Sequence, residues 1–331
     1  ARLGGDEFTI LLEYLRDSGE AVLVTERILA AFQEPFWLGG HEVVVSTSVG
    51  IALAQQPVDE PSILLRDADA ALYRAKQDGK ARYALFDPTM HAAAMERLRD
   101  QARQEQAPTD LLRKSDLDLL GAIGVLRDGQ LTRAGLLIAG QAEAIGRHLP
   151  NFGWTHERMK SATAYDNRVD GRDENALALP LALAAIEARI NADNPISTIE
   201  HGLYHFEYRA YPTIALREAL LNALTHLDLR LASPVLVKQY PRRLEITNPG
   251  GLVGGITSAN ILHHPPLARN LQLVQALARL RLVNRSNLGI GRMFEAMLVE
   301  GKEPPLIIDE ESAVRVVFKR QETARPFREF I

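Results

Sequence analysis

Residues 4–8 read Gly4-Gly5-Asp6-Glu7-Phe8, and this stretch decides the fold expected for the first part of the chain. Two glycines and two carboxylates stand at the entry of an apolar run, residues 8–14, which we predict to be a strand. Glycine accepts a positive φ and lets the backbone approach a ligand closely. Adjacent carboxylates offer hard oxygen ligands to a divalent cation, which can neutralise triphosphate charge. The alternative is an ordinary hairpin turn with solvated acids.

The elements that follow predict a compact α+β unit. Helical spacing over 19–32 is followed by a hairpin, 36–38 and 42–53, which turns at Gly39-Gly40. A second helix is expected over 62–77, closed by Gly79, and a last strand over 82–86.

This pattern resembles the C-terminal half of a GGDEF domain, the diguanylate cyclase domain that makes cyclic di-GMP from GTP. The resemblance rests on residues 4–8, on Val45–Ala52 and on Asp69–Lys80. It implies half of a cyclase-like palm fold over residues 1–88.

The resemblance also implies roles for six residues. Asp6 would bind Mg²⁺ and act as a base-like acid, with Glu7 as its neighbouring carboxylate. Gly4 and Gly5 would face the GTP, and Lys76 and Lys80 would contact phosphates. Taken without the resemblance, the two lysines are a solvated helix end, where cations suit the helix dipole.

By this resemblance we expect the given sequence to begin inside the domain, after the segments in which the family carries a further metal-binding Asp and its guanine-reading residues. Two-metal phosphoryl transfer needs both sources of acid. We therefore expect that this chain alone does not synthesise cyclic di-GMP.

A change of composition indicates a domain boundary. Residues 89–109 are rich in Ala, Arg, Gln and Glu, and predict an exposed helical linker. A second domain is expected over 110–320, followed by a tail over 321–331.

The second domain carries a polar stripe on an apolar helix. Glu218, Asn222 and His226 are spaced i, i+4 and i+8, so they share one face of the helix predicted over 212–227. A buried polar group without a partner costs about 1–3 kcal/mol, so these side chains need a ligand, water or backbone partner. A solvated polar face is the alternative.

Two glycine-containing segments follow that helix. Asn248-Pro249-Gly250-Gly251 comes after a predicted strand, and Gly289-Ile290-Gly291-Arg292 opens a helix. Glycine turns at helix N-termini present backbone N–H groups to phosphate.

This set resembles the C-terminal ATPase-like domain of RecG-like proteins, which is related to the GHKL ATP fold, an α/β sandwich. By that resemblance Glu218 would position water, Asn222 would hold Mg²⁺ and Asn248 would read adenine with Gly250 beside it. Gly289 and Gly291 would form the phosphate turn. No G-x-x-x-x-G-K-[ST] loop occurs, which argues against a helicase motor.

Arg279, Arg281, Arg285 and Arg292 cluster in the sequence and could bind phosphate, but a solvated helix face is the favoured interpretation.

Composition excludes several classes of protein. The chain has no cysteine, so thiolate nucleophiles and Cys-ligated zinc are excluded. The net charge of −4 gives no general electrostatic case for nucleic acid. No apolar stretch approaches the roughly 20 residues that span a bilayer. Together these features predict a cytoplasmic protein without a membrane segment.

Three hypotheses remain from the sequence. The chain is a GGDEF signalling remnant, an ATP-binding regulator of transcription or DNA transactions, or a fusion without joint function. The expected ligands are GTP or ATP with Mg²⁺. DNA would be bound through a missing or partner domain, and a homodimer is possible.

Overall fold

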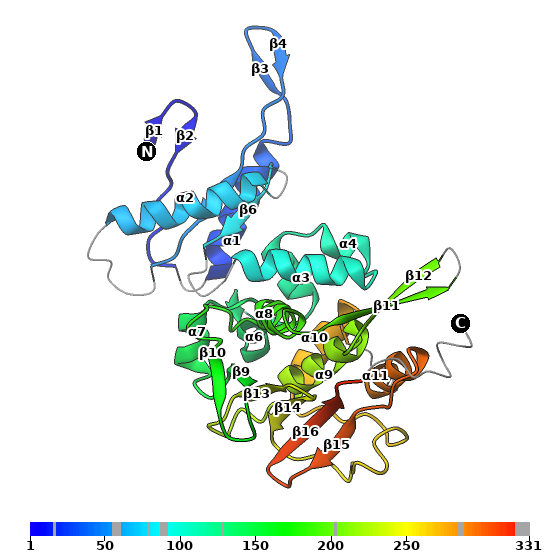
Figure 1. Cartoon of the computed structure of the whole chain (residues 1–331). Coiled ribbons are helices and arrows are strands. Elements are labelled where there is room, and N and C mark those ends of the chain that lie inside the picture. The colour runs from blue at the N-terminus through cyan, green and yellow to red at the C-terminus, as the bar shows by residue number, and fades with distance from the viewer. Residues whose placement is uncertain are drawn as a thin grey trace. The chain divides into compact units, whose positions relative to one another are not determined.

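The computed structural model describes residues 1–15, 18–54, 61–77, 80–86, 92–127, 129–201, 204–283 and 288–321. The chain divides into two compact units (Figure 1). The first comprises Ala1–Pro88, Arg113–Ala122 and Leu126–Gln130. The second comprises Thr89–Leu112, Ile123–Val125 and Leu131–Ile331.

In its described residues, the first unit contains small two-stranded sheets and three helices. Its elements are β1 (Arg2–Gly4), β2 (Glu7–Phe8), α1 (Ser18–Ala31), β3 (Phe36–Leu38), β4 (His41–Val43), β5 (Val49–Ile51), α2 (Pro61–Gln77), β6 (Tyr83–Leu85), α5 (Asp116–Ala122) and β7 (Leu126–Arg127), which pairs with β8 (Gln130–Leu131). The turn predicted at Gly39-Gly40 is confirmed: both glycines have positive φ, 57° and 84°, as a type I′ turn requires. The second strand, predicted over 42–53, is wrong beyond Val43, because β4 ends there and β5 pairs with β6.

The core of the first unit forms where α1 and α2 meet the parallel pair β5–β6. Ala21, Ile51 and Leu85 are buried together. Gly50 allows α2 to lie directly on β5, because a Cβ at this position would stand 2.1 Å from the carbonyl oxygen of Ala68.

The strand predicted over residues 8–14 is wrong beyond its first residue. Only Glu7–Phe8 pairs, with β1, and residues 9–13 have no regular structure. Phe8 is 70% exposed and Leu11 is 70% exposed, so within the described residues no neighbouring strand covers this run.

The second unit is a mixed sheet with helices. Its elements are α3 (Ala92–Gln104), α4 (Thr109–Leu112), α6 (Arg133–Ala139), α7 (Ala142–His148), β9 (Trp154–Met159), β10 (Tyr165–Asp170), α8 (Leu179–Asn191), β11 (Ile196–His201), β12 (Tyr204–Arg209), α9 (Thr213–His226), β13 (Val235–Tyr240), β14 (Arg243–Pro249), α10 (Leu271–Arg279), α11 (Leu288–Val299), β15 (Leu306–Asp309) and β16 (Ala313–Lys319).

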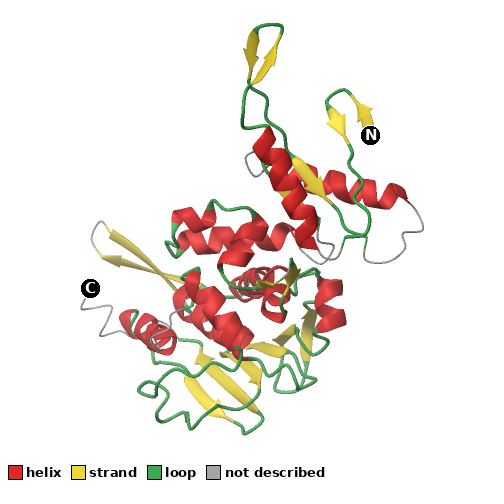
Figure 2. Cartoon of the chain, turned by 180° about the vertical axis from the view of Figure 1, so that it is seen from behind, coloured by secondary structure: helices red, strands yellow, loops and turns green. Residues whose placement is uncertain are grey.

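Six of these strands form one sheet in the order β10-β9-β13-β14-β16-β15. The β9–β13 pair is parallel and the other pairs are antiparallel. Helices α8 and α9 contact each other and pack on one face of this sheet, α8 against β9 and α9 against β14. Figure 2 shows helices in red beside the yellow strands. The expected combination of helices and a sheet is thus present.

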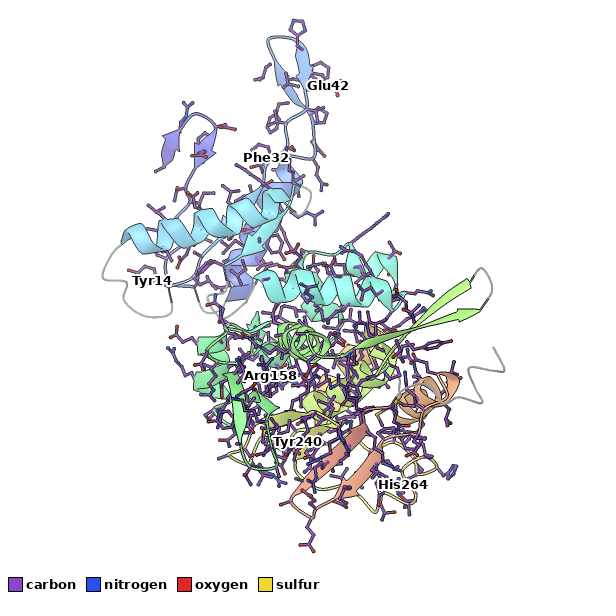
Figure 3. All side chains as sticks on the ribbon, in the orientation of Figure 1. Tyr14, Phe32, Glu42, Arg158, Tyr240 and His264 are labelled. Carbon is purple, nitrogen blue, oxygen red and sulfur yellow. The ribbon has the colours of Figure 1, made fainter. Side chains whose placement is uncertain are left out.

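The two faces of the sheet differ in chemistry. On the helix side, Gln239 Nε2 donates to the carbonyl oxygen of Ile190 in α8, and Gln239 Oε1 lies 3.1 Å from His156 Nε2. Successive strand residues point to opposite faces, so Glu157 lies on the other side, where it pairs with Lys238 at 3.7 Å and Arg168 at 3.5 Å. At the β13–β14 turn, Arg243 stacks on the ring of Tyr240, which is labelled in Figure 3.

Helix α3 corrects the expectation of an exposed helix at 89–109. Its side chains Ala94, Met95, Leu98 and Ala102 are at most 1% exposed, and the helix packs on α8 and α6. The many charged residues of this stretch are confined to one face, and composition alone does not reveal the apolar stripe on the other.

Two further parts of the second unit and its neighbouring segment are short. Strands β11 and β12 form a hairpin whose residues 202–203 lie outside the described part. Helices α4 and α5 have four and seven residues. In the described residues, no helix combines the length and apolar character needed to cross a bilayer.

Candidate functional site

The first turn of α11 lies against the polar stripe of α9. A Cβ at Gly289 would stand 3.1 Å from Glu218 Oε2, 3.6 Å from Asn222 Nδ2 and 3.9 Å from Asn222 Oδ1. The absence of a side chain at Gly289 therefore brings the backbone of a helix N-terminus to two of the three stripe residues. Glu218, Asn222 and Gly289 are the centre of the candidate site. They are separated by up to 71 positions in the chain.

Glu218 is a buried acid at this centre. The residue is 7% exposed, and Arg292 Nη1 of α11 lies 3.0 Å from Glu218 Oε1. Burial raises the pKa of Glu218, while the positive charges of Arg292 and Arg217 oppose that rise. The Arg292 side chain is 38% exposed and also pairs with this acid, so the interpretation as a solvated helix face describes it only in part.

Asn222 carries unused hydrogen-bonding capacity. Its Nδ2 is buried and, among the described residues, has no hydrogen-bond partner. An amide and a carboxylate one helical turn apart are hard oxygen donors of the kind that Mg²⁺ takes. Asn222 Oδ1 and a carboxylate oxygen of Glu218 thus fit Mg²⁺ by type, while the unpartnered Asn222 Nδ2 is a donor that suits a water or phosphate oxygen.

Gly291 differs from Gly289 in its surroundings. A Cβ at Gly291 would meet no atom within 4 Å. Of the two glycines predicted to form the phosphate turn, Gly289 makes the close approach, and Gly291 lies in open space.

A second polar group surrounds the C-terminal end of α9. Asn248, at the end of β14, is 8% exposed, and its Oδ1 has no hydrogen-bond partner in the described part of the chain. Gly250 has a φ of +100°, and a Cβ there would lie 2.8 Å from Asp228 Cβ. Both the left-handed backbone and this close contact require glycine at position 250.

Arg269 fastens the loop after β14 to the end of α9. Its guanidinium donates to Asp228 Oδ2 at 2.9 Å and to the carbonyl oxygen of Gly251 at 2.6 Å. Hydrogen bonds from Arg230 are the main reason that the pKa of Asp228 falls to about 2, and Arg269 adds to this. Asn270 donates to the carbonyl oxygens of Thr225 and Leu227, both at 2.9 Å.

His226, the third stripe residue, sits at this same end of α9. Burial, together with the smaller effect of the charge of Arg269, lowers its pKa to about 4. Glu218 and His226 are eight residues apart, which is about 12 Å along the helix. The Gly289 contact and the Arg269 cluster therefore lie at separate points along α9.

The residues predicted to bind GTP in the first unit include exposed side chains. Asp6 and Glu7 are exposed side chains on the β1–β2 hairpin, where Gly5 has a φ of +53° and Gly4 pairs with Glu7. Lys76 and Lys80 are also exposed, and Lys80 has a φ of +60°. No ion pair joins either acid to either lysine within the described ranges.

Comparison with known families assigns both ends of the chain. The family model described as "Diguanylate cyclase, GGDEF domain" matches residues 1–82. The model described as "Putative ATP-dependent DNA helicase recG C-terminal" matches residues 232–318. The chain joins a GGDEF segment to a RecG-like C-terminal segment. A domain of unknown function matches residues 87–155, between the two.

The RecG-like match includes Asn248, Gly250 and Gly289 but begins after Glu218 and Asn222. The structure joins the two sets, since Gly289 contacts both α9 residues.

Curated relatives share the GGDEF segment. The bifunctional diguanylate cyclase/cyclic di-GMP phosphodiesterase MucR of Pseudomonas aeruginosa is 40% identical over 98 residues, covering 30% of this chain and 14% of MucR. Diguanylate cyclase TpbB of the same species is 43% identical over 81 residues, covering 24% of this chain and 19% of TpbB. The chain thus spans less than a fifth of either relative, and both relatives are cyclic di-GMP signalling proteins by name.

One solved structure resembles most of the chain. The DIP2311 protein from Corynebacterium diphtheriae matches with a TM-score of 0.62 and 23% identity, covering 89% of this chain and 55% of that one. This likeness shows a shared fold.

Three residues near the site have roles that sequence reasoning missed. Asp228 and Arg269 are 41 positions apart, so no local spacing predicts their pairing. Glu105, which contacts Arg217 and Arg292, lies in the stretch interpreted as a linker. A carboxylate that directly follows an Arg-rich helix gives no signal of a long-range contact.

Proposed function

We propose that this chain is a nucleotide-binding signalling protein whose second unit binds ATP with Mg²⁺ between α9 and the N-terminus of α11. The observation that carries the proposal is the approach of Gly289 to Glu218 and Asn222. A helix N-terminus offers N–H donors and a favourable dipole to phosphate, and the glycine leaves its backbone accessible.

Different residues would bind the metal ion and the base of the nucleotide. Asn222 and Glu218 would hold Mg²⁺, which would neutralise phosphate charge when bound. Glu218 is also the group that would orient a water molecule, and burial raises the pKa of its carboxyl group. At the other end of α9, Asn248 offers an unpartnered buried oxygen to the amino group of an adenine.

The geometry along α9 supports this division. The phosphate end at Gly289 and the base end at Asn248 and Gly250 are placed at different levels of one helix, as an extended nucleotide requires. Arg269 fixes the base end by holding Asp228 and the carbonyl oxygen of Gly251.

For the first unit we propose a diguanylate cyclase remnant that makes no cyclic di-GMP in this chain. The exposed acids Asp6 and Glu7 stand on a two-stranded hairpin, and phosphoryl transfer with two metals needs acids from more than one segment. The domain division at 1–88, 89–109, 110–320 and 321–331 stays a prediction.

The test is a titration of the full chain with a fluorescent ATP analogue and Mg²⁺. The double variant Glu218→Ala with Asn222→Ala is expected to abolish binding. Glu143→Ala, which removes an exposed carboxylate on α7, is the matched control and should bind as the unmodified chain does. Equal affinity in the double variant and the control would remove the site.

Regulation of transcription or DNA transactions through a missing or partner domain stays a prediction from the RecG-like resemblance, as does a homodimer. A mobility-shift assay at several salt concentrations tests the first, because phosphate contacts make DNA affinity fall steeply with salt. Light scattering tests the second.

A further inference from the structure

A carboxylate from outside the matched ATPase-like segment lies between two arginines at the candidate site. Glu105 directly follows α3. Its Oε1 lies 3.2 Å from Arg217 Nε on α9, and its Oε2 lies 3.9 Å from Arg292 Nη2 on α11. Arg292 also reaches Glu218 Oε1 at 3.0 Å through its other terminal nitrogen. The guanidinium groups of Arg217 and Arg292 thus both contact the carboxylate of Glu105. This carboxylate lies next to the part of the site where we propose that phosphate binds.

The two arginines have more binding capacity than Glu105 uses. Arg217 Nη2 is buried and has no hydrogen-bond partner among the described residues. A guanidinium presents donors in a planar fork that suits two oxygens of a carboxylate or phosphate. Glu105 engages Arg217 through Nε only, and its contact with Arg292 is long.

Glu105 is also the member of this cluster that can leave most easily. Its side chain is 23% exposed, whereas the Glu218 side chain is 9% exposed. Moving Glu105 into water restores its hydration, while withdrawing Glu218 would separate it from Asn222 and Gly289.

We infer that Arg217 and Arg292 form the binding site for the terminal phosphate of the nucleotide, called here the phosphate seat. The Glu105 carboxylate occupies this site until a nucleoside triphosphate displaces it. This inference rests on the proposed function, because the seat adjoins Glu218. It gives the segment after α3 a competitive role: a triphosphate must expel Glu105, whereas a diphosphate, which ends one phosphate earlier, leaves it in place.

A purely structural ion-pair cluster predicts a different response. If Glu105 only fastens α3 to α9 and α11, removing its charge lowers stability and leaves nucleotide affinity unchanged or weaker. If it competes with phosphate, removing its charge strengthens triphosphate binding.

The experiment is calorimetric titration of the full chain with ATP, ADP and inorganic tripolyphosphate, each with Mg²⁺. Glu105→Gln keeps the shape and removes the charge. Glu96→Gln makes the same change at an exposed position of α3 and is the matched control. We expect Glu105→Gln to tighten ATP binding about tenfold, or 1.4 kcal/mol, with little change for ADP and none in the control. Adding Arg292→Gln should cancel the gain.

Each outcome separates this inference from the proposed function. If ATP binds the unmodified chain and Glu105→Gln equally, or if ATP and ADP gain alike, the phosphate seat is refuted and ATP binding stands. If neither protein binds ATP but tripolyphosphate binds Glu105→Gln and not the variant that also lacks Arg292, the seat stands and the nucleotide proposal falls. If no anion binds any variant, both fall.

Discussion

The backbone of Gly289 lies against the carboxylate of Glu218: a Cβ added at Gly289 would stand only 3.1 Å from Glu218 Oε2. Such a distance is tighter than ordinary van der Waals contact. The contact joins the first turn of α11 to the middle of α9. A negative group at this position is favoured by the helix dipole, whether it is a carboxylate or a phosphate.

Gly289→Ala should weaken ATP binding by about tenfold, because the methyl group pushes against Glu218 and narrows the approach to the helix N-terminus. Alanine in a helix is otherwise favourable by up to about 1 kcal/mol over glycine. Gly146→Ala in α7 is the control, since a Cβ there meets nothing within 4 Å. The affinity for ATP, measured by calorimetry, should be unchanged in the control. Equal affinities for both variants would contradict the close approach.

Arg269→Gln should lower the free energy of unfolding by about 2 kcal/mol, because Asp228 is buried and loses a charged partner. The carbonyl oxygen of Gly251 loses its donor as well. Arg147→Gln removes an exposed ion pair with Glu143 and should cost less than about 1 kcal/mol. Chemical denaturation of both variants measures the difference. A loss at Arg269 no larger than that at Arg147 would show that the cluster does not stabilise the loop.

Stability should fall as the pH falls from about 6.5 to about 4, in part through His226. Its pKa is about 4 in the folded chain and about 6.5 when unfolded. Between these values the unfolded state binds more protons, so acid favours unfolding, by up to about 3 kcal/mol at the lower limit. Denaturation curves across this range measure the effect.

The variant His226→Gln separates the contribution of His226 to the pH dependence from that of other titratable groups whose pKa is shifted. Glu218 has a raised pKa, which acts in the opposite direction in acid. The variant should therefore lose less stability than the unmodified chain between pH 6.5 and 4. Parallel pH profiles for the two proteins would show that His226 is not titrating as its burial requires.

Leu98→Ala should destabilise the second unit by about 2–5 kcal/mol, because Leu98 is fully buried in α3. Leu271→Ala truncates a leucine that is 58% exposed at the start of α10 and should have a small effect. Thermal unfolding compares the two. If both variants unfold at the same temperature as the unmodified chain, α3 is not part of the folded unit.

The chain incubated with GTP and Mg²⁺ should form no cyclic di-GMP. Asp6 and Glu7 are exposed on a hairpin and lack ion pairs with Lys76 or Lys80 in the described residues. Chromatography of the reaction mixture, with a complete diguanylate cyclase as the positive control, measures the product. Accumulation of the dinucleotide would refute the assignment of the first unit as an inactive remnant.

Local patterns predicted many of the elements. The apolar spacing over 212–227 matches α9, and the Gly39-Gly40 turn matches its hairpin, because both depend on residues close in the sequence. The shared face of Glu218 and Asn222 follows from helix geometry, and Gly289 is placed beside them.

Long-range contacts could not be predicted in the same way. Glu105 reaches Arg217 across more than a hundred residues, and Arg269 reaches Asp228 across 41. No periodicity encodes such pairs. The burial of α3 was missed for a related reason, since its apolar face is short and its charged residues dominate the composition.

Amide hydrogen exchange of the full chain, with and without ATP and Mg²⁺, tests most directly whether the second unit holds the nucleotide. The account predicts slower exchange on ATP addition in 213–226, 248–251 and 288–292, and no change in 1–86. Unchanged exchange in those three segments at saturating ATP, or protection confined to the first unit, would contradict it.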